Sequence, residues 1–386
     1  MAIYFALAIF IYIYGKLYHA NRTLRRRKVY LIITFGILIL VAGLRNPSVG
    51  IDLAGHYATR YNMIASYGWS QVPAFSALTG YEVGYCYYTK LLNVFVGGVQ
   101  FFVFITSLLI YLAFAYFIYK ESKDVILSTE IMLFSSLYYM CMNIMRQGLA
   151  MAIVIVAYVW LDYSDRKLKD YIKFGLLVLL SATFHNSAIL CLIMILFDRL
   201  KFTRKQIFIG ISAMAVSYLF YINIYTAVLG LFVTDNNYER YLTSATESVG
   251  NMNMQTIYNF GLAFFALLLG YYVLVWKRKS VKGLWKSQSN EYRLERNESF
   301  MLFMVLIAST FRLMVFRMNI INRMSYYFIP FILVLYPYSI NSIKLKANRQ
   351  IIRFAVYGLF IIYFVWMTIN KAAEFYGTVP FSFYWQ

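Results

Sequence analysis

The chain has 386 residues, of which 61% are hydrophobic and only 13% are charged. Soluble domains are about 45–50% apolar and about 25% charged, so this composition excludes an ordinary soluble enzyme. The net charge of +20 does not indicate nucleic-acid binding, because Lys and Arg occur in short runs beside apolar segments, as the positive-inside rule describes.

Apolar runs long enough to cross roughly 30 Å of hydrocarbon as helices recur along the whole chain. They predict an all-α, polytopic membrane protein with about twelve membrane segments. The segments lie near residues 1–18, 29–44, 99–119, 125–143, 147–163, 172–184, 187–198, 206–231, 255–276, 299–316, 324–340 and 351–369.

The first apolar segment precedes a basic cluster at residues 22–28, whereas a signal peptide carries its positive charge first. We therefore expect a retained first helix with its N-terminus outside. Threading the remaining segments from this start places 27 Lys and Arg residues inside and 9 outside, and leaves the C-terminus outside as well.

Residues 172–196 are the ambiguous step, because they also have the length of a single crossing. A single crossing would leave 17 Lys and Arg inside against 19 outside, so the charge bias favours two short pieces that turn at residues 184–186. Each piece is only about 18–20 Å long at 1.5 Å per residue. The sequence thus predicts a re-entrant pair, which is tolerated where it is buried in protein or lines a cavity.

The remaining segments suggest a single transmembrane domain over residues 1–386 with three notable loops. We expect a large external loop at 45–98 with short amphipathic helices on the membrane surface. A second external loop is expected at 232–254 and a basic cytoplasmic loop at 277–298. The aromatic C-terminus, residues 376–385, is expected at the membrane interface.

Five arginines are expected at the outer face, where the positive-inside rule predicts few. Arginine binds phosphate oxygens bidentately, so we expect the set to bind a diphosphate at the membrane surface. For each single arginine the alternative is snorkelling, or structural pairing with an acidic side chain. The set consists of Arg45, Arg146, Arg312, Arg317 and Arg323.

Three residues are candidate catalytic groups, because a His or a carboxylate can remove the proton of an attacking hydroxyl. His185 lies at the predicted turn, where a buried, hydrogen-bonded His is the alternative. Asp52 is a candidate base, an orienting group or a neutralising partner of Arg45. Glu82 is a candidate for contacts to sugar hydroxyls or an ordinary loop glutamate. No metal-ligand spacing and no phosphate-cradling glycine loop is present, so we expect neither a metal nor another cofactor.

Five short motifs in one order resemble the EpsG family, which belongs with Wzy-type polysaccharide polymerases. The resemblance covers roughly residues 40–330. It rests on Arg45…Gly50-x-Asp52…Tyr57…Tyr61, Glu82-x-Gly84-Tyr85, Arg146-Gln147-x-x-Ala150, Phe184-His185-x-Ser187-Ala188 and Arg323…Tyr326-Tyr327-Phe328.

The resemblance implies a multi-pass enzyme of the bacterial cytoplasmic membrane, related to the GT-C class of glycosyltransferases. Such an enzyme polymerises undecaprenyl-diphosphate-linked oligosaccharide repeat units of an exopolysaccharide or O-antigen on the outer face, without a metal. The arginines would bind the diphosphate, and His185 or Asp52 would activate the acceptor hydroxyl. Sugars would be positioned by Glu82 and by Tyr57, Tyr85, Gln147 and Tyr326. The other expected partner is membrane lipid; a chain-length regulator is left open.

Three other functions are alternatives to a polymerase. An O-antigen ligase would use the same donor with a different acceptor. A flippase or transporter of lipid-linked glycan would need access from both faces, whereas the unusual ionisable residues fall on one predicted face. A membrane acyltransferase would also use a His, but the arginine set suits a diphosphate better than an acyl thioester.

Overall fold

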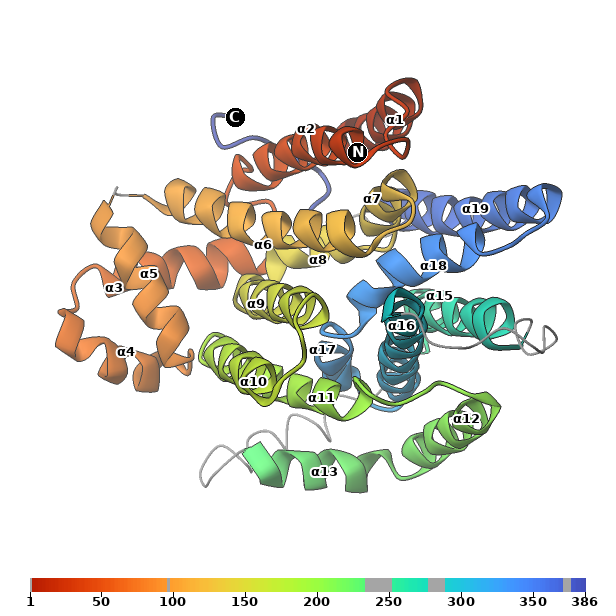
Figure 1. The fold of residues 1–386 in the computed structure, drawn as a ribbon. Coiled ribbons are helices and arrows are strands. Elements are labelled where there is room, and N and C mark those ends of the chain that lie inside the picture. Colours follow the sequence, from red (N-terminus) through yellow and green to blue (C-terminus); the bar gives the residue numbers. More distant parts are fainter. Residues whose placement is uncertain (1, 96–97, 233–251, 277–288, 371–375) are drawn as a thin grey trace. The chain divides into compact units, whose positions relative to one another are not determined.

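The computed structural model describes residues 2–95, 98–232, 252–276, 289–370 and 376–386. Within these residues the chain is helical, and the one strand-like feature is an isolated antiparallel bridge between Arg45 and Phe383. The expected all-α fold is confirmed for this part of the chain (Figure 1). The chain divides into two compact units, Met1–Cys191 with Ala355–Gln386, and Leu192–Phe354.

The first unit contains the elements from α1 to η3 and the end of α19. They are α1 (Ala2–Leu17), α2 (Leu24–Gly43), the π-helix η1 (Leu53–Ala58), α3 (Thr59–Ile64), the 3-10 helix η2 (Trp69–Gln71), α4 (Val72–Thr79), α5 (Val83–Phe95), α6 (Val99–Glu121), α7 (Val125–Phe134), α8 (Leu137–Asn143), α9 (Met145–Asp162), α10 (Leu168–Ala182) and the 3-10 helix η3 (Asn186–Leu192).

The core of the first unit forms around α7 and α8, in which every residue is buried. Largely apolar helices belong in the interior of a protein, and the three polar side chains of α7, Ser128, Thr129 and Glu130, are buried with the rest. Nearby, α6 packs against both α2 and α9, and α9 packs against α10. The start of α9, which carries Arg146, is therefore fixed by helices on two sides.

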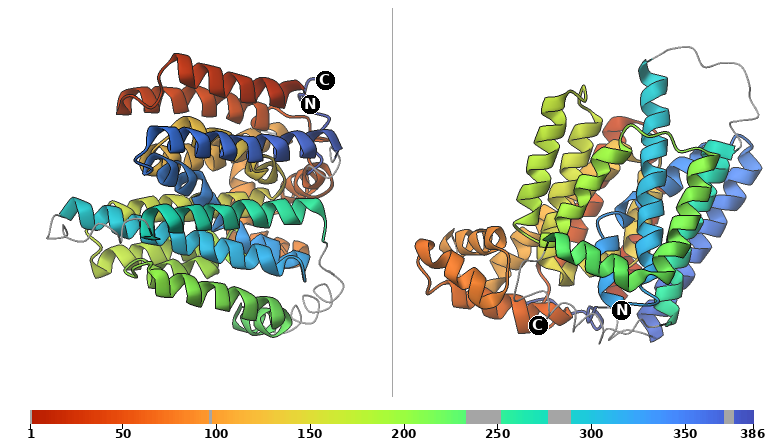
Figure 2. Two further views of the ribbon diagram at one scale, coloured as in Figure 1. Left: turned by 90° about the vertical axis from the view of Figure 1, so that its right-hand side faces the viewer. Right: turned by 90° about the horizontal axis from the view of Figure 1, so that it is seen from below.

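The second unit contains the elements from α11 to the start of α19. They are α11 (Ile193–Phe197), α12 (Arg204–Leu219), α13 (Tyr221–Phe232), α15 (Met254–Gly270), the π-helix η4 (Tyr271–Trp276), α16 (Ser289–Met314), the 3-10 helix η6 (Asn319–Ile321), α17 (Asn322–Ser325), the 3-10 helix η7 (Ile329–Phe331), α18 (Ile332–Asn341) and α19 (Lys346–Asn370). Here α15 and α16 lie side by side, as Figures 1 and 2 show, and α12 packs on α16.

Among the described residues, five helical segments are long and apolar enough to cross a membrane, or seven if each of two bent pairs counts as one span. Three shorter apolar helices, Ala2–Leu17, Asn186–Phe197 and Ile329–Asn341, accompany them. These segments support an integral membrane protein. The expected number of twelve membrane segments is not confirmed by length and composition, and the GT-C likeness stays a prediction.

Two segments that the sequence analysis treated as single helices are broken. Residues 125–143 form α7 and α8, which meet at an angle of 55°, and residues 204–227 contain a bend of 91° between α12 and α13. At the first break, Ser136 adopts a left-handed conformation (φ 67°) that cannot continue a right-handed helix. At the second, α12 ends at Leu219 and Phe220 leaves helical geometry (φ −106°, ψ 30°).

Two of the predicted loops contain helix. The external loop at residues 45–98, for which short helices were expected, holds η1, α3, η2, α4 and α5, and the path of these helices along a membrane surface stays a prediction. Of the second external loop, residues 233–251 lie outside the described part of the chain. The same is true of residues 277–288 in the basic loop, whereas residues 289–298 belong to α16.

Candidate functional site

Three residues far apart in sequence meet in the first unit, namely Glu82, Arg146 and His185, which we call the Glu82 cluster. One carboxylate oxygen of Glu82 accepts a hydrogen bond from Arg146 Nη1 at 2.5 Å. The other lies 3.0 Å from His185 Nδ1 and accepts the backbone N–H of Asn186 at 3.1 Å. The three side chains are 10%, 18% and 14% exposed, so the ion pair is shielded but reachable from solvent.

Local backbone geometry brings Glu82 to this position. Gly80 ends α4 in a left-handed conformation (φ 67°) that glycine adopts without steric cost. The chain then turns, and the carbonyl of Glu82 accepts the N–H of Cys86 as α5 begins. Glu82 thus lies at the entrance of a helix, where a carboxylate is favoured by the helix dipole.

Gly84 explains how α5 approaches the chain break that carries His185. An ideal Cβ on Gly84 would lie 2.1 Å from Thr183 Oγ1 and 2.9 Å from the Thr183 carbonyl oxygen. That carbonyl accepts the N–H of Tyr85 at 3.1 Å. The glycine of the Glu82-x-Gly84-Tyr85 motif is therefore required for a close backbone contact.

The break between residues 182 and 186 occurs where the sequence predicted a turn. Helix α10 ends at Ala182, the N–H of His185 bonds back to the Ser181 carbonyl at 3.1 Å, and a 3-10 helix begins at Asn186. The predicted interruption of the helix is confirmed. A re-entrant path through a membrane stays a prediction.

The electrostatics of the cluster determine which ring nitrogen of His185 carries the proton. Burial raises the pKa of the Glu82 carboxyl, but the hydrogen bond from His185, the charge of His185 when it is protonated and the charge of Arg146 together outweigh burial and lower this pKa below its usual value. An ionised carboxylate only accepts hydrogen bonds, so Nδ1 of His185 must donate to it. In neutral His185 the other ring nitrogen, Nε2, is then available to accept a proton.

Tyr81 extends the cluster towards a second arginine. The guanidinium carbons of Arg146 and Arg60 lie 3.8 Å and 4.4 Å from the centre of its ring, which places two cations against one aromatic side chain. Arg60 Nη1 donates to the Tyr81 hydroxyl at 2.9 Å and lies 3.2 Å from Nδ1 of the exposed His56.

Arg60 and Tyr81 are not among the site residues predicted from the sequence. The sequence does contain a signal for Arg60, because His56 and Arg60 are four residues apart and hence neighbours on a helix. Tyr81 precedes Glu82 directly.

Asp52, Tyr57 and Tyr85 lie near the Glu82 cluster. Tyr57, Tyr81 and Tyr85 pack with ring centres 5.6–6.2 Å apart. Burial raises the pKa of the Tyr57 hydroxyl to about 12, while the nearby charge of Arg146 opposes this rise and that of Asp52 adds to it. Tyr57 and Tyr85 are 6% and 2% exposed, so in this structure they support Tyr81, and their contact with sugar stays a prediction. Gln147, beside Arg146 on α9, is also buried.

Arg45 has a different environment from the other predicted arginines. It is fully buried and donates to the carbonyl oxygens of Ala42, Val49 (3.3 Å) and Met142 (2.7 Å). A guanidinium with this set of partners joins three chain segments. The geometry favours a structural role for Arg45, and no solvent-facing nitrogen remains to support the expected diphosphate contact.

The other three arginines belong to the second unit. Arg312 is buried in the last turn of α16, with its guanidinium 5.6 Å from the Tyr326 ring. Arg317 is exposed and lies 5.4 Å and 5.1 Å from the rings of Tyr218 and Tyr221, and Arg323 is exposed on α17. These arginines therefore lie in one short segment, with tyrosines beside two of them.

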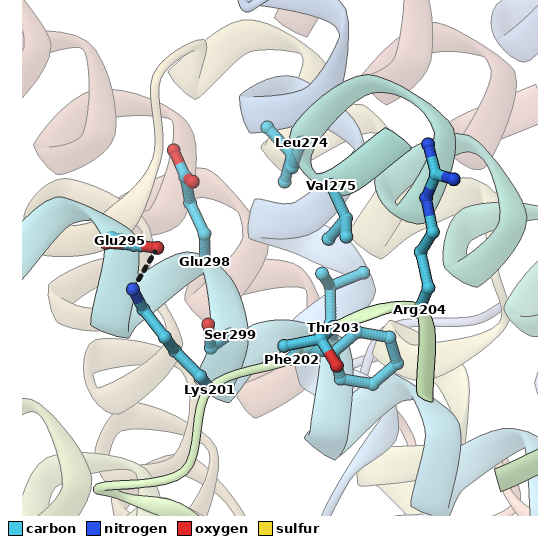
Figure 3. A pocket seen from close by; sticks show the side chains of 10 residues that line it. Lys201, Phe202, Thr203, Arg204, Leu274, Val275, Glu295, Glu298 and Ser299 are labelled. Atoms are coloured by element: carbon cyan, nitrogen blue, oxygen red, sulfur yellow. Dashed lines mark ion pairs between the residues drawn. The ribbon is translucent and has the colours of Figure 1, made fainter. Parts of the chain in front are cut away.

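A cavity of about 240 Å³ also lies in the second unit, and Figure 3 shows its side chains. Lys201 and Glu295 form an ion pair of 2.9 Å at its edge, and Glu298 lines it. Arg312 lies fourteen positions after Glu298 on α16, which is about 21 Å along the helix at 1.5 Å per residue. None of the predicted site residues lines this cavity. In the parts of the chain that the structure describes, no group of three or more His, Cys, Asp or Glu is arranged to hold a metal ion.

Comparison with known proteins gives one match. A family model described as the EpsG family covers residues 28–383, which is nearly the whole chain and includes every residue of the Glu82 cluster. No curated protein and no solved structure matches the chain.

Proposed function

The chain belongs to the EpsG family of Wzy-type polysaccharide polymerases, and on this basis we propose that it polymerises lipid-linked oligosaccharide repeat units. The growing glycan would move from undecaprenyl diphosphate to a sugar hydroxyl of the next lipid-linked unit, on the outer face of the bacterial cytoplasmic membrane. The observation that carries the proposal is the Glu82 cluster, which joins a base, its orienting carboxylate and a cation.

His185 is the proposed general base. Its Nδ1–H donates to Glu82, which fixes the ring and leaves Nε2 to accept the proton of the acceptor hydroxyl as that oxygen attacks the anomeric carbon. Glu82 keeps the tautomer and stabilises the imidazolium that forms, the role that the carboxylate has in other acid–base triads. A base in this position contributes typically about 10²- to 10⁴-fold to the rate.

Arg146 and Arg60 are the proposed ligands of the diphosphate in the first unit. Because their guanidinium carbons lie 3.8 Å and 4.4 Å from one ring centre, the two are at most about 8 Å apart, the sum of the two distances. Two phosphoryl groups joined by one oxygen are small enough to contact both cations. As the glycosidic bond breaks, negative charge grows on the diphosphate, and fixed guanidinium groups stabilise it.

The segment of the second unit with Arg312, Arg317 and Arg323 is proposed separately, by itself, as a site that binds a diphosphate. Supporting it are the exposed positions of Arg317 and Arg323 and the aromatic rings beside Arg312 and Arg317. Replacement of each by Ala should lower activity and leave the protein folded. If two of the three variants keep full activity, this segment has no part in donor binding.

The assay for the proposal uses purified protein and an undecaprenyl-diphosphate-linked repeat unit in detergent. Wild-type protein should produce a ladder of products with several repeats, and His185→Ala should not. A ligase would transfer glycan once to a different acceptor and give no ladder, and a flippase would form no glycosidic bond. Either of those results would refute the polymerase.

A measurement of donor binding tests the role of Arg60 independently of the role of His185 as the base. Arg60→Ala should weaken the binding of undecaprenyl diphosphate by about tenfold, because one charge-assisted contact is worth about 1.5–3 kcal/mol and this one is partly exposed. Arg25→Ala is the matched control, since Arg25 is exposed on α2. Equal affinities of the two variants would exclude Arg60 from the site.

A further inference from the structure

The C-terminal tail, Tyr376–Gln386, lies along residues 44–51 of the first unit. Main-chain hydrogen bonds join Asn46 N–H to Ser382 O (2.9 Å) and Tyr384 N–H to Leu44 O (2.9 Å), on either side of the bridge that pairs Arg45 with Phe383. Two more join Gly50 N–H to Gly377 O (2.8 Å) and Ile51 N–H to Tyr376 O (3.1 Å). The tail thus forms main-chain hydrogen bonds with both the beginning and the end of the segment 44–51.

The tail is itself fixed in place. Thr378 is fully buried and Val379 is 5% exposed, and the Thr378 carbonyl accepts the hydroxyl of Tyr4 on α1 at 2.9 Å. The ring of Phe381 packs edge-on against Tyr4 with ring centres 5.8 Å apart. These contacts give the tail a defined position against which residues 44–51 are held.

Residues 44–51, to which the tail is hydrogen-bonded, directly precede Asp52 in the chain. Gly50 has a left-handed backbone (φ 108°), and an ideal Cβ there would lie 3.1 Å from Asn143 Oδ1. The same oxygen accepts the N–H of Asp52 at 3.4 Å. Asp52 then precedes η1, whose Tyr57 packs against Tyr81. A shift of Gly50 would therefore move Asp52 and the tyrosine that supports Tyr81.

We propose that the C-terminal tail is a positioning segment for the candidate site, acting through the backbone of Gly50 and Ile51 on Asp52 and Tyr57. The inference rests on the proposed function for its catalytic consequence, but tail docking is measured independently. The family match, which extends to residue 383, includes the part of the tail that makes three of these four main-chain contacts.

The test compares two truncated chains. A chain that ends at residue 375 lacks the tail, whereas a control that ends at Tyr384 loses two residues and keeps all four main-chain hydrogen bonds to residues 44–51. Each is made with Val49→Cys, because Val49 is 1% exposed and the three native cysteines are buried. The measurements are the reaction of this cysteine with a maleimide, the kcat and KM of glycan polymerisation, and the effect of adding a synthetic peptide of residues 376–386.

Removal of the tail should speed the maleimide reaction at least tenfold and lower kcat by a similar factor, and the control should match the full chain. The peptide should restore both, because an extended segment can bind again through main-chain hydrogen bonds. Rescue by the peptide and not by a scrambled peptide separates positioning from a general loss of fold.

Three outcomes would overturn the inference. They are an unchanged maleimide reaction without the tail, a faster reaction with unchanged kcat, and a loss of activity that the peptide does not reverse. If the full chain itself forms no polymer, the proposed function fails, and the maleimide reaction still decides whether the tail holds residues 44–51.

Discussion

Glu82→Gln tests the central ion pair with the smallest change of shape. Glutamine occupies the same volume, but it carries no charge and offers one acceptor oxygen where Glu82 uses both. The three donors are Arg146 Nη1, His185 Nδ1 and the N–H of Asn186. In the variant the amide group must point its own N–H towards one of these donors.

The expected cost follows from the burial of the pair. Removing one partner of a buried ion pair destabilises a protein by about 3–5 kcal/mol. Because Glu82 and Arg146 are 10% and 18% exposed, solvent reduces this figure, and we expect about 2–4 kcal/mol. The polymerisation rate should fall by about 10²- to 10⁴-fold, because His185 loses the group that fixes its tautomer.

The assay measures the polymerisation rate with saturating donor and the thermal unfolding of the protein in detergent. Asp165→Asn is the control, because Asp165 pairs with Lys167 at an exposed site, with side chains 77% and 66% exposed. It should leave rate and stability unchanged. A Glu82→Gln protein with the wild-type rate would refute the role of Glu82 as the orienting group.

Arg45→Ala should lower the melting temperature strongly, because it leaves buried carbonyls without donors; normal stability with lost donor binding would restore the diphosphate role. Gly84→Ala should reduce activity, since its Cβ would overlap Thr183, and a fully active variant would show that this contact is dispensable. Because the folded pKa of Glu82 is lowered, its stabilisation is present above its unfolded pKa, about 4.3, and is lost as pH falls through the folded pKa. The difference in unfolding free energy between wild type and Glu82→Gln should accordingly shrink below about pH 4. A difference that grows there would contradict this reasoning. Asn186→Cys, at an exposed position, should react with an impermeant reagent from outside only; reaction from inside would overturn the expected topology.

Much of the fold follows from hydropathy, because each apolar segment of the sequence coincides with helix in the structure. The bends do not follow from it. Apolar composition reports burial in lipid or protein and carries no information on helix direction. The pair Ser135-Ser136 was a usable signal for the first break, whereas Phe220 at the second break lies between Leu219 and Tyr221, with no Gly or Pro beside it to indicate a break.

The site could be predicted only in part from the sequence, because the sequence indicates candidate residues and not their contacts. Glu82, Arg146 and His185 were candidates as rare ionisable residues, but their mutual contacts depend on tertiary packing of α5, α9 and the break after α10. Arg45 shares the residue type and the predicted face of Arg146, and only the structure separates them. Its burial depends on the carbonyls that surround it, which no sequence pattern encodes.

The most direct test of the proposed polymerase is a gel of surface glycan from a strain that lacks this gene. The strain is rescued with wild-type protein, with His185→Ala or with the Asp165→Asn control. The proposal predicts lipid carrying a single repeat in the deletion strain, a ladder with wild type and control, and a single repeat with His185→Ala. A ladder in the deletion strain, or the absence of any glycan on its outer face, would contradict a polymerase.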